Sequence, residues 1–171
     1  MRIAAEILTA AAATLGLAAC NTSGCTENQN SIPLAGFYSS AAEAQVSLDS
    51  VGVYGVGVPG DSLLLAPGTS ASQIYLPLNA SAASTSFVFT YRGPGLDNPL
   101  LNDTLTFVYD AVPYFAGEEC GAIYVYDITR LDVTDHLIDS VALLDRHITN
   151  VDIESLKIFF RTAEPEPEPE Q

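Results

Sequence analysis

Two short aromatic runs with a period of two residues most constrain what this chain can fold into. In Phe87–Tyr91, and again in Leu105–Tyr109, large apolar side chains occupy every second position. Successive side chains of a β-strand point to opposite faces of a sheet, so each run presents its aromatic residues on one face. We therefore predict two strands that form two halves of a core between sheets.

Similar alternations begin at Ile32 and are separated by Gly, Pro, Asn and Asp at short spacing. This pattern is typical of an all-β sandwich or barrel. The predicted strands are Leu34–Tyr38, Val46–Val53, Ser62–Leu65, Gln73–Leu78, Ser86–Arg92, Thr104–Tyr109, Ala122–Ile128, Ser140–Leu143 and Leu156–Phe160. We expect an all-β fold, an antiparallel β-sandwich that is immunoglobulin-like or similar, with about 7 to 9 strands.

Three segments depart from simple alternation. Within Val46–Val53 the apolar phase slips between Leu48 and Val51, which predicts a β-bulge or a break near Asp49 and Ser50. Ala41–Gln45 is expected to form one helical turn. The stretch from Val133 to Ile148 has mixed periods and fits either a helical face or, at Ser140–Leu143, a strand.

The N-terminal segment has the features of a signal peptide. Residues 7–19 form an uninterrupted run of Ala, Leu, Ile, Thr and Gly, which is too short to span about 30 Å of hydrocarbon as a helix. The run closes on Leu17-Ala18-Ala19-Cys20, which resembles the lipobox of bacterial lipoproteins. This resemblance implies cleavage before Cys20 and lipidation of Cys20, and the attached acyl chains would anchor the protein to a membrane. An ordinary secretory signal followed by an incidental cysteine is the alternative.

The remaining cysteines are Cys25 and Cys120. If Cys20 carries lipid, the oxidising conditions of the periplasm favour a disulfide between these two, and two free or intermolecular thiols are the alternative. Such a bridge would close a loop approaching 100 residues.

Charge excludes one class of partner. The chain has 21 acidic and 6 basic residues, and loss of residues 1–19 removes one of each, so the net charge stays at -15. A surface of this kind repels nucleic acid and anionic headgroups, so we expect the lipid to be the only attachment to the membrane.

The expected organisation is a signal peptide (1–19), a polar lipid-anchored tether (20–31), a β-sandwich domain (32–161) and a disordered tail (162–171). We expect the tail to be disordered because Glu alternates with Pro, which prevents both helix formation and sheet pairing.

Several short segments resemble those of a known group of proteins. They are Cys25, Leu48-Asp49-Ser50-Val51, Asp61-Ser62-Leu63, Leu76-Pro77-Leu78-Asn79, Ser84–Phe89, Asp103-Thr104-Leu105, Glu119-Cys120-Gly121 and Ile138-Asp139-Ser140-Val141. Together they resemble a family of uncharacterised lipoproteins from Bacteroidota, whose function is unknown. The acidic run that often follows the lipidated cysteine of surface-displayed lipoproteins in this phylum is missing from Asn21 to Gly24. The resemblance therefore implies an outer-membrane position that faces the periplasm.

No catalytic motif is recognisable, and no cofactor is expected. The strongest candidates for metal ligands are Asp132, Asp135, His136 and Asp139, whose carboxylates and imidazole suit a divalent cation. Their spacing does not match an EF-hand, so solvated surface charges and loop caps are the favoured interpretation.

Three classes of function remain. We expect a lipid-anchored, non-enzymatic module that binds or scaffolds another envelope protein. A module that binds a small ligand, carbohydrate or Ca²⁺ is the alternative, and an enzyme is the third class. Aromatic residues that could contact a sugar are Tyr54, Tyr75, Tyr114, Phe115, Tyr124 and Tyr126. An exposed apolar patch would favour the first class, and a pocket with converging carboxylates would favour the others.

Overall fold

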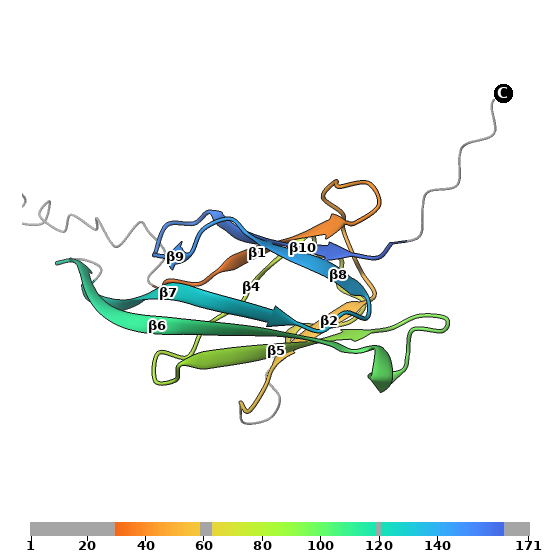
Figure 1. Cartoon of the computed structure of the whole chain (residues 1–171), viewed down its shortest axis with the longest axis horizontal. Helices are drawn as coiled ribbons and strands as arrows, with labels where there is room; N and C mark the ends of the chain where they lie inside the picture. Colours follow the sequence, from red (N-terminus) through yellow and green to blue (C-terminus); the bar gives the residue numbers. More distant parts are fainter. Residues whose placement is uncertain (1–29, 59–62, 119–120, 163–171) are drawn as a thin grey trace, which may run out of the picture.

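The computed structural model of this chain describes residues 30–58, 63–118 and 121–162 (Figure 1). The elements are β1 (Leu34–Ser39), β2 (Val51–Gly55), β3 (Leu63–Leu65), β4 (Gln73–Tyr75), β5 (Ser84–Tyr91), the short 3₁₀ helix η1 (Pro99–Leu101), β6 (Asp103–Gly117), β7 (Gly121–Val133), β8 (Ile138–Leu143), β9 (His147–Ile148) and β10 (Glu154–Phe160). In this part of the chain no helix is long and apolar enough to cross a membrane.

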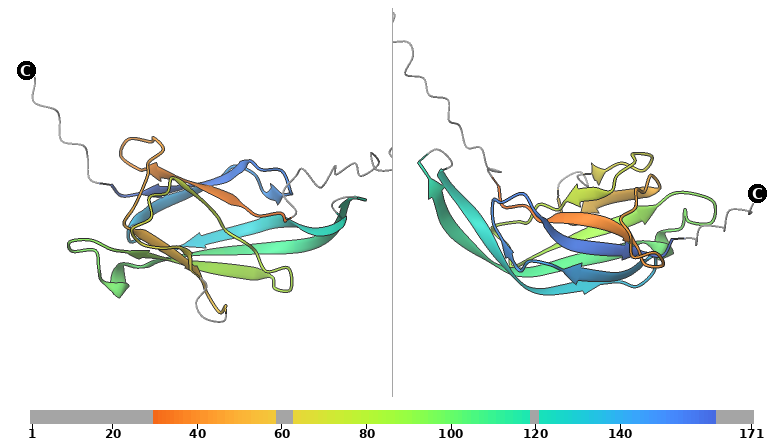
Figure 2. Two further views of the ribbon diagram at one scale, coloured as in Figure 1. Left: turned by 180° about the vertical axis from the view of Figure 1, so that it is seen from behind. Right: turned by 90° about the horizontal axis from the view of Figure 1, so that it is seen from above.

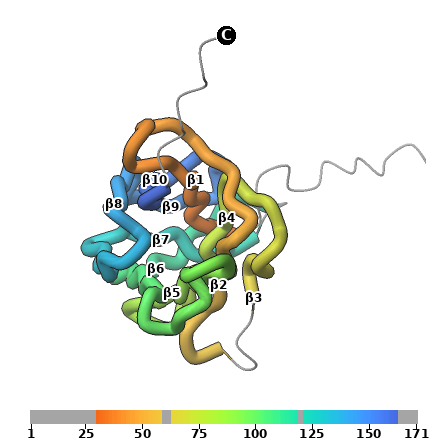
Figure 3. Tube along the Cα trace, turned by 90° about the vertical axis from the view of Figure 1, so that its right-hand side faces the viewer, coloured from red at the N-terminus to blue at the C-terminus, as the bar shows by residue number. Residues whose placement is uncertain are grey.

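The strands form two sheets. One has four strands in the order β4-β1-β10-β8, and the other has six in the order β3-β2-β5-β6-β7-β9. Figure 3, which looks along the sandwich, shows β1, β10 and β8 in one layer and β5 and β6 in the other. The predicted all-β sandwich is therefore confirmed. Among the described strands, all pairs are antiparallel except β1 with β10, whose parallel contact joins the two ends of the domain.

The core lies between the two layers, where the alternating residues of each strand meet. On β5 the buried residues include Phe87 and Phe89, as the period of two predicts. The rings of Phe89 and Phe160 lie 6.2 Å apart and come from different sheets. Offset and edge-on ring contacts of this kind add to the free energy of apolar burial.

One expectation about the aromatic strands is wrong. β5 and β6 are not opposite halves of the core, because they pair with each other in one sheet, with Phe87 opposite Leu105. The other side of the core comes from β1 and β10, and includes Phe37 and Phe160. The connection 92–102 returns the chain antiparallel to β5, so the two strands become neighbours.

The three segments that depart from simple alternation differ in structure. The predicted break near Asp49 and Ser50 is confirmed, since both residues form a bend and β2 begins only at Val51. Ala41–Gln45 contains a turn and no helix, with Glu43 at a positive φ of 51°. The stretch from Val133 to Ile148 contains strands β8 and β9, so the strand interpretation is the correct one there.

The longest elements exceed their predicted lengths. β6 and β7 pair along almost their whole length, from Leu105 opposite Val133 to Gly117 opposite Gly121. β5 accompanies β6 only as far as Val108, so the rest of β6 and its partner form a two-stranded ribbon that projects beyond the sandwich (Figures 1 and 2). We call residues 109–118 and 121–126 the β6–β7 ribbon.

Candidate binding surface

Asp103 is the most heavily hydrogen-bonded side chain of the described region. It is the first residue of β6 and is fully buried. It lies opposite the connection between β7 and β8, where the chain passes from one sheet to the other. Its Oδ1 accepts from Thr134 Oγ1 at 2.8 Å and from the His136 backbone N–H at 2.9 Å, and lies 3.2 Å from His136 Nδ1. Its Oδ2 accepts from Tyr91 at 2.7 Å and from the Leu137 and Ile138 N–H groups at 2.8 Å each.

These contacts also set the protonation of the buried pair. Burial acts to raise the pKa of Asp103, but hydrogen bonds from the Ile138 N–H, the Tyr91 hydroxyl, the His136 N–H and the Thr134 hydroxyl outweigh it and lower the pKa. Burial raises the pKa of Tyr91, and its bond to Asp103 raises it further. Asp103 is therefore an ionised acceptor and Tyr91 a neutral donor. We assign this cluster a structural role, which is to hold the β7–β8 crossover against β6.

The candidate metal ligands do not converge. Among the described residues no group of three or more His, Cys, Asp or Glu side chains could hold a metal ion. Asp132 pairs with Arg130, and His136 faces Asp103. Asp135 and Asp139 both contact the guanidinium of Arg161, and the hydrogen bond that Arg161 donates to Asp135 raises the pKa of the guanidinium. The cation between these two carboxylates is thus an arginine of the chain itself.

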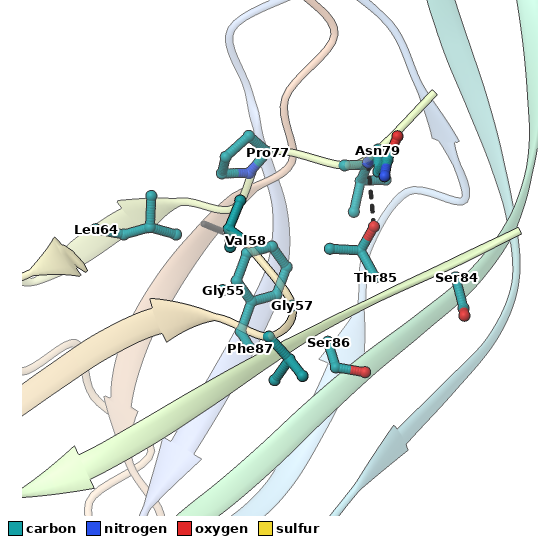
Figure 4. Close-up of a pocket in the computed structure, with 12 residues that line it drawn as sticks. Gly55, Gly57, Val58, Leu64, Pro77, Asn79, Ser84, Thr85, Ser86 and Phe87 are labelled. Atoms are coloured by element: carbon teal, nitrogen blue, oxygen red, sulfur yellow. Dashed lines mark hydrogen bonds between the residues drawn. The ribbon is translucent and has the colours of Figure 1, made fainter. Parts of the chain in front are cut away.

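A solvent-open groove of about 470 Å³ lies beside the end of β2 and the start of β5 (Figure 4). We call it the β2–β5 groove. Its lining residues are Gly55, Val56, Gly57, Val58, Leu64, Pro77, Leu78, Asn79, Ser84, Thr85, Ser86 and Phe87. None of these described residues carries a charge, although the chain as a whole has a net charge of -15.

Several polar groups of this groove bond to one another or to the neighbouring Tyr109 and Thr106. The Asn79 N–H lies 3.1 Å from Thr85 Oγ1 and 3.0 Å from the Tyr109 hydroxyl, which in turn donates to the Asn79 carbonyl at 2.8 Å. The rim is apolar, and Val56 and Val58 are 53% and 41% exposed. The groove therefore offers exposed apolar surface to an occupant.

A second cavity, of about 320 Å³, lies on the other side of Pro77 and Leu78. It is bounded by the first described residues, Asn30 to Ile32, and by the start of β7, Ala122 to Tyr124, with Tyr126. Ser31 is 4% exposed, and its Oγ has no hydrogen-bond partner among the described residues. The beginning of the domain thus packs against the β6–β7 ribbon.

Exposed apolar side chains gather on the ribbon. Val112, Tyr114, Phe115 and Tyr124 are 43%, 53%, 65% and 46% exposed. Tyr114, Phe115 and Tyr124 are among the aromatic residues named from the sequence, but periodicity did not place Tyr114 and Phe115 on a strand, because the predicted strand stopped at Tyr109. The usable signal was the continued run Ala111 to Ala116, which is apolar without alternation.

The other tyrosines considered for sugar contact are scattered. Tyr126 is buried and its ring packs edge-on against Tyr109 at 5.2 Å. Tyr75 lies on β4 in the four-stranded sheet, where its hydroxyl donates to Asp152, and Tyr54 is half-buried on β2. They do not form one aromatic platform.

Lipidation of Cys20 and the pairing of Cys25 with Cys120 concern residues outside the described region, as do the signal peptide and most of the tail. The first described residue after Cys25, Asn30, nonetheless lies near Ala122, which follows Cys120 by two positions. Asn30 and Ala122 line the same cavity.

A model of a family of unknown function, DUF6452, matches residues 50–160, which run from the start of β2 to the end of β10. The chain belongs to this family. Since the family's function is unknown, membership assigns no activity to any of the surfaces described above. No curated protein and no solved structure matches the chain.

Proposed function

We propose that this chain is a lipid-anchored protein of the bacterial envelope, a non-enzymatic module that holds another envelope protein in the β2–β5 groove. The proposed anchor is lipid on Cys20, in an outer membrane and on its periplasmic side. The observation that carries the binding role is the uncharged groove on a strongly acidic protein. Apolar surface that stays open to solvent is typical of protein contacts.

The chemistry of the groove favours an apolar protein segment over the other ligands considered. Ca²⁺ requires oxygen ligands, usually carboxylates, and the described lining residues include no carboxylate. A sugar ring would need an exposed aromatic face, and Phe87, the one aromatic side chain of the lining, is only 1% exposed. The volume lies in the range of small-molecule sites, so an uncharged small ligand is the alternative.

The test of the groove compares two substitutions of equal exposure. Val56 is 53% exposed and lines the groove, whereas Leu144 is 52% exposed and lies just after β8, outside the groove. A photo-crosslinking residue at position 56 should give one defined protein adduct in intact cells, and the same residue at position 144 should not. The purified partner should bind the Leu144→Asp variant with the affinity that it has for the natural chain. Its affinity for the Val56→Asp variant should fall at least about tenfold, because a carboxylate in the apolar contact costs about 1.4 kcal/mol or more. Equal adducts at both positions would reject the groove as the binding site.

The anchor is tested independently. Cys20→Ser should move the protein from the membrane fraction to the soluble periplasmic fraction, because lipid is the proposed attachment. A variant that still fractionates with membranes would contradict lipidation at Cys20.

A further inference from the structure

We infer that the β6–β7 ribbon contacts the lipid bilayer to which the protein is anchored, with Val112, Tyr114, Phe115 and Tyr124 at the level of the headgroups. This inference rests on the proposed lipid anchor and adds an orientation to it: the ribbon faces the membrane, and the loop between β5 and β6 faces away.

Exposed apolar side chains lie on both faces of the ribbon, although Ile123 is buried and Asp110 is exposed. In an antiparallel pair, residues directly opposite each other share a face of the sheet. Tyr114 lies opposite Ile123 on one face, and Phe115 lies opposite Ala122 on the other. A partner with a single groove would cover one face only, whereas the interfacial region of a bilayer surrounds an inserted ribbon and covers both.

The start of the domain lies at this ribbon. Asn30 and Ser31 share a cavity with Ala122 and Tyr124. Asn30 lies ten positions after Cys20, so the chain between them spans at most about 35 Å when fully extended. By contrast, Leu100 precedes β6. The twelve-residue advance along β6 from Asp103 to Phe115 places Leu100 and Phe115 about 40 Å apart along the strand.

The charge of the ribbon defines the kind of membrane contact. The sequence from Tyr109 to Ile128 contains no Lys or Arg, so attraction to anionic lipid is not part of the contact. Tyrosine favours the boundary between headgroups and acyl chains, because its ring is apolar and its hydroxyl is polar. Exposed Glu118, which follows β6, stays hydrated and limits the depth to the headgroup layer.

The chain contains no tryptophan, which makes a single introduced tryptophan a clean probe of this contact. Phe115→Trp is the reporter, and Leu100→Trp is the matched control at a residue 80% exposed. Both proteins are prepared with the lipid attached and reconstituted into phosphatidylethanolamine vesicles that contain a minor share of phosphatidylglycerol, with or without bromine on the acyl chains. The Phe115→Trp emission should shift to the blue and fall at least about twofold with the brominated lipid, and the Leu100→Trp emission should change in neither respect.

The outcomes separate the orientation from the anchor. Mass spectrometry of the Cys20 peptide from the natural chain tests the anchor alone, and an unmodified Cys20 overturns the proposed lipidation. If the proteins float but both tryptophans respond equally to bromine, the orientation is wrong and the anchor stands. If the Phe115→Trp emission shifts only after the partner protein is added, the ribbon is a protein-binding element and the bilayer contact is rejected.

Discussion

Asp103→Asn is expected to destabilise the domain strongly, although it changes only one side-chain atom. The amide keeps one acceptor oxygen and replaces the other by an NH₂ group. The least disruptive orientation places NH₂ at the Oδ1 position, where Thr134 can accept a hydrogen bond but the His136 N–H cannot. The alternative would leave both the Leu137 and Ile138 N–H groups without an acceptor.

The magnitude follows from this inventory. One unsatisfied buried N–H costs about 1–3 kcal/mol, and the three donors to Oδ2 each lose the advantage of a charged acceptor, about 1 kcal/mol apiece. The neutral amide is cheaper to bury than a carboxylate, which offsets part of this loss. We expect a net decrease of about 2–4 kcal/mol in the free energy of unfolding, which lowers Tm by about 5–15 °C for a domain of this size.

The assay is urea and thermal unfolding of the natural chain and its variants, followed by circular dichroism at neutral pH. Asp97→Asn is the control, because the Asp97 carboxylate is 63% exposed and pairs with Arg92 at the surface, where an ion pair contributes no more than about 1 kcal/mol.

The lowered pKa of Asp103 adds a pH dependence to the stability of the domain. Its stabilisation is complete above the unfolded pKa of about 3.9 and is lost as the pH falls through the lower folded pKa. The difference between the natural chain and Asp103→Asn should therefore shrink below about pH 4. A Tm within about 2 °C of the control at neutral pH would refute the structural role of Asp103.

Three further predictions follow from the same structure. Tyr91→Phe removes one of the donors to Asp103 and should cost about 1–2 kcal/mol in chemical unfolding. In the Asp103→Asn background, where the tyrosine would donate to a neutral oxygen, the cost should be smaller by about 1 kcal/mol; additive costs would show that the two residues act separately. Cys25 and Cys120 should be found in one linked peptide pair by mass spectrometry of the unreduced protein, whereas complete alkylation of both thiols without reduction would exclude the bridge. Deletion of Glu164 to Gln171 should leave Tm within about 1 °C, because the tail has no apolar side chain to bury; a larger decrease would show that it docks on the domain.

The sequence predicted those features that depend on neighbouring residues alone. The alternation in Phe87–Tyr91 correctly identified the buried face of β5, and the slip between Leu48 and Val51 correctly located the break before β2. Each signal arises from side chains that alternate along a single strand, so no distant contact is needed to interpret it.

The projecting ribbon shows why strand length was harder to predict. Pro113 lies within β6 and has no N–H to donate to a neighbouring strand, which normally argues against a strand. β5 has already ended its pairing at Val108, so beyond that point β6 has a partner on one side only and tolerates the missing donor. The prediction ended at Tyr109 because the open edge is a property of the assembled sheet.

Composition and local spacing by themselves determined the all-β class, the acidic surface, and the positions of most strands. Only the tertiary structure decided that β5 and β6 are neighbours in one sheet. It also decided that Asp103 accepts hydrogen bonds from the β7–β8 crossover and that Arg161 lies between Asp135 and Asp139. The physical reason is that a side-chain period depends on the geometry of one strand, whereas sheet order and buried polar contacts join residues far apart in the chain, here Asp103 with Ile138.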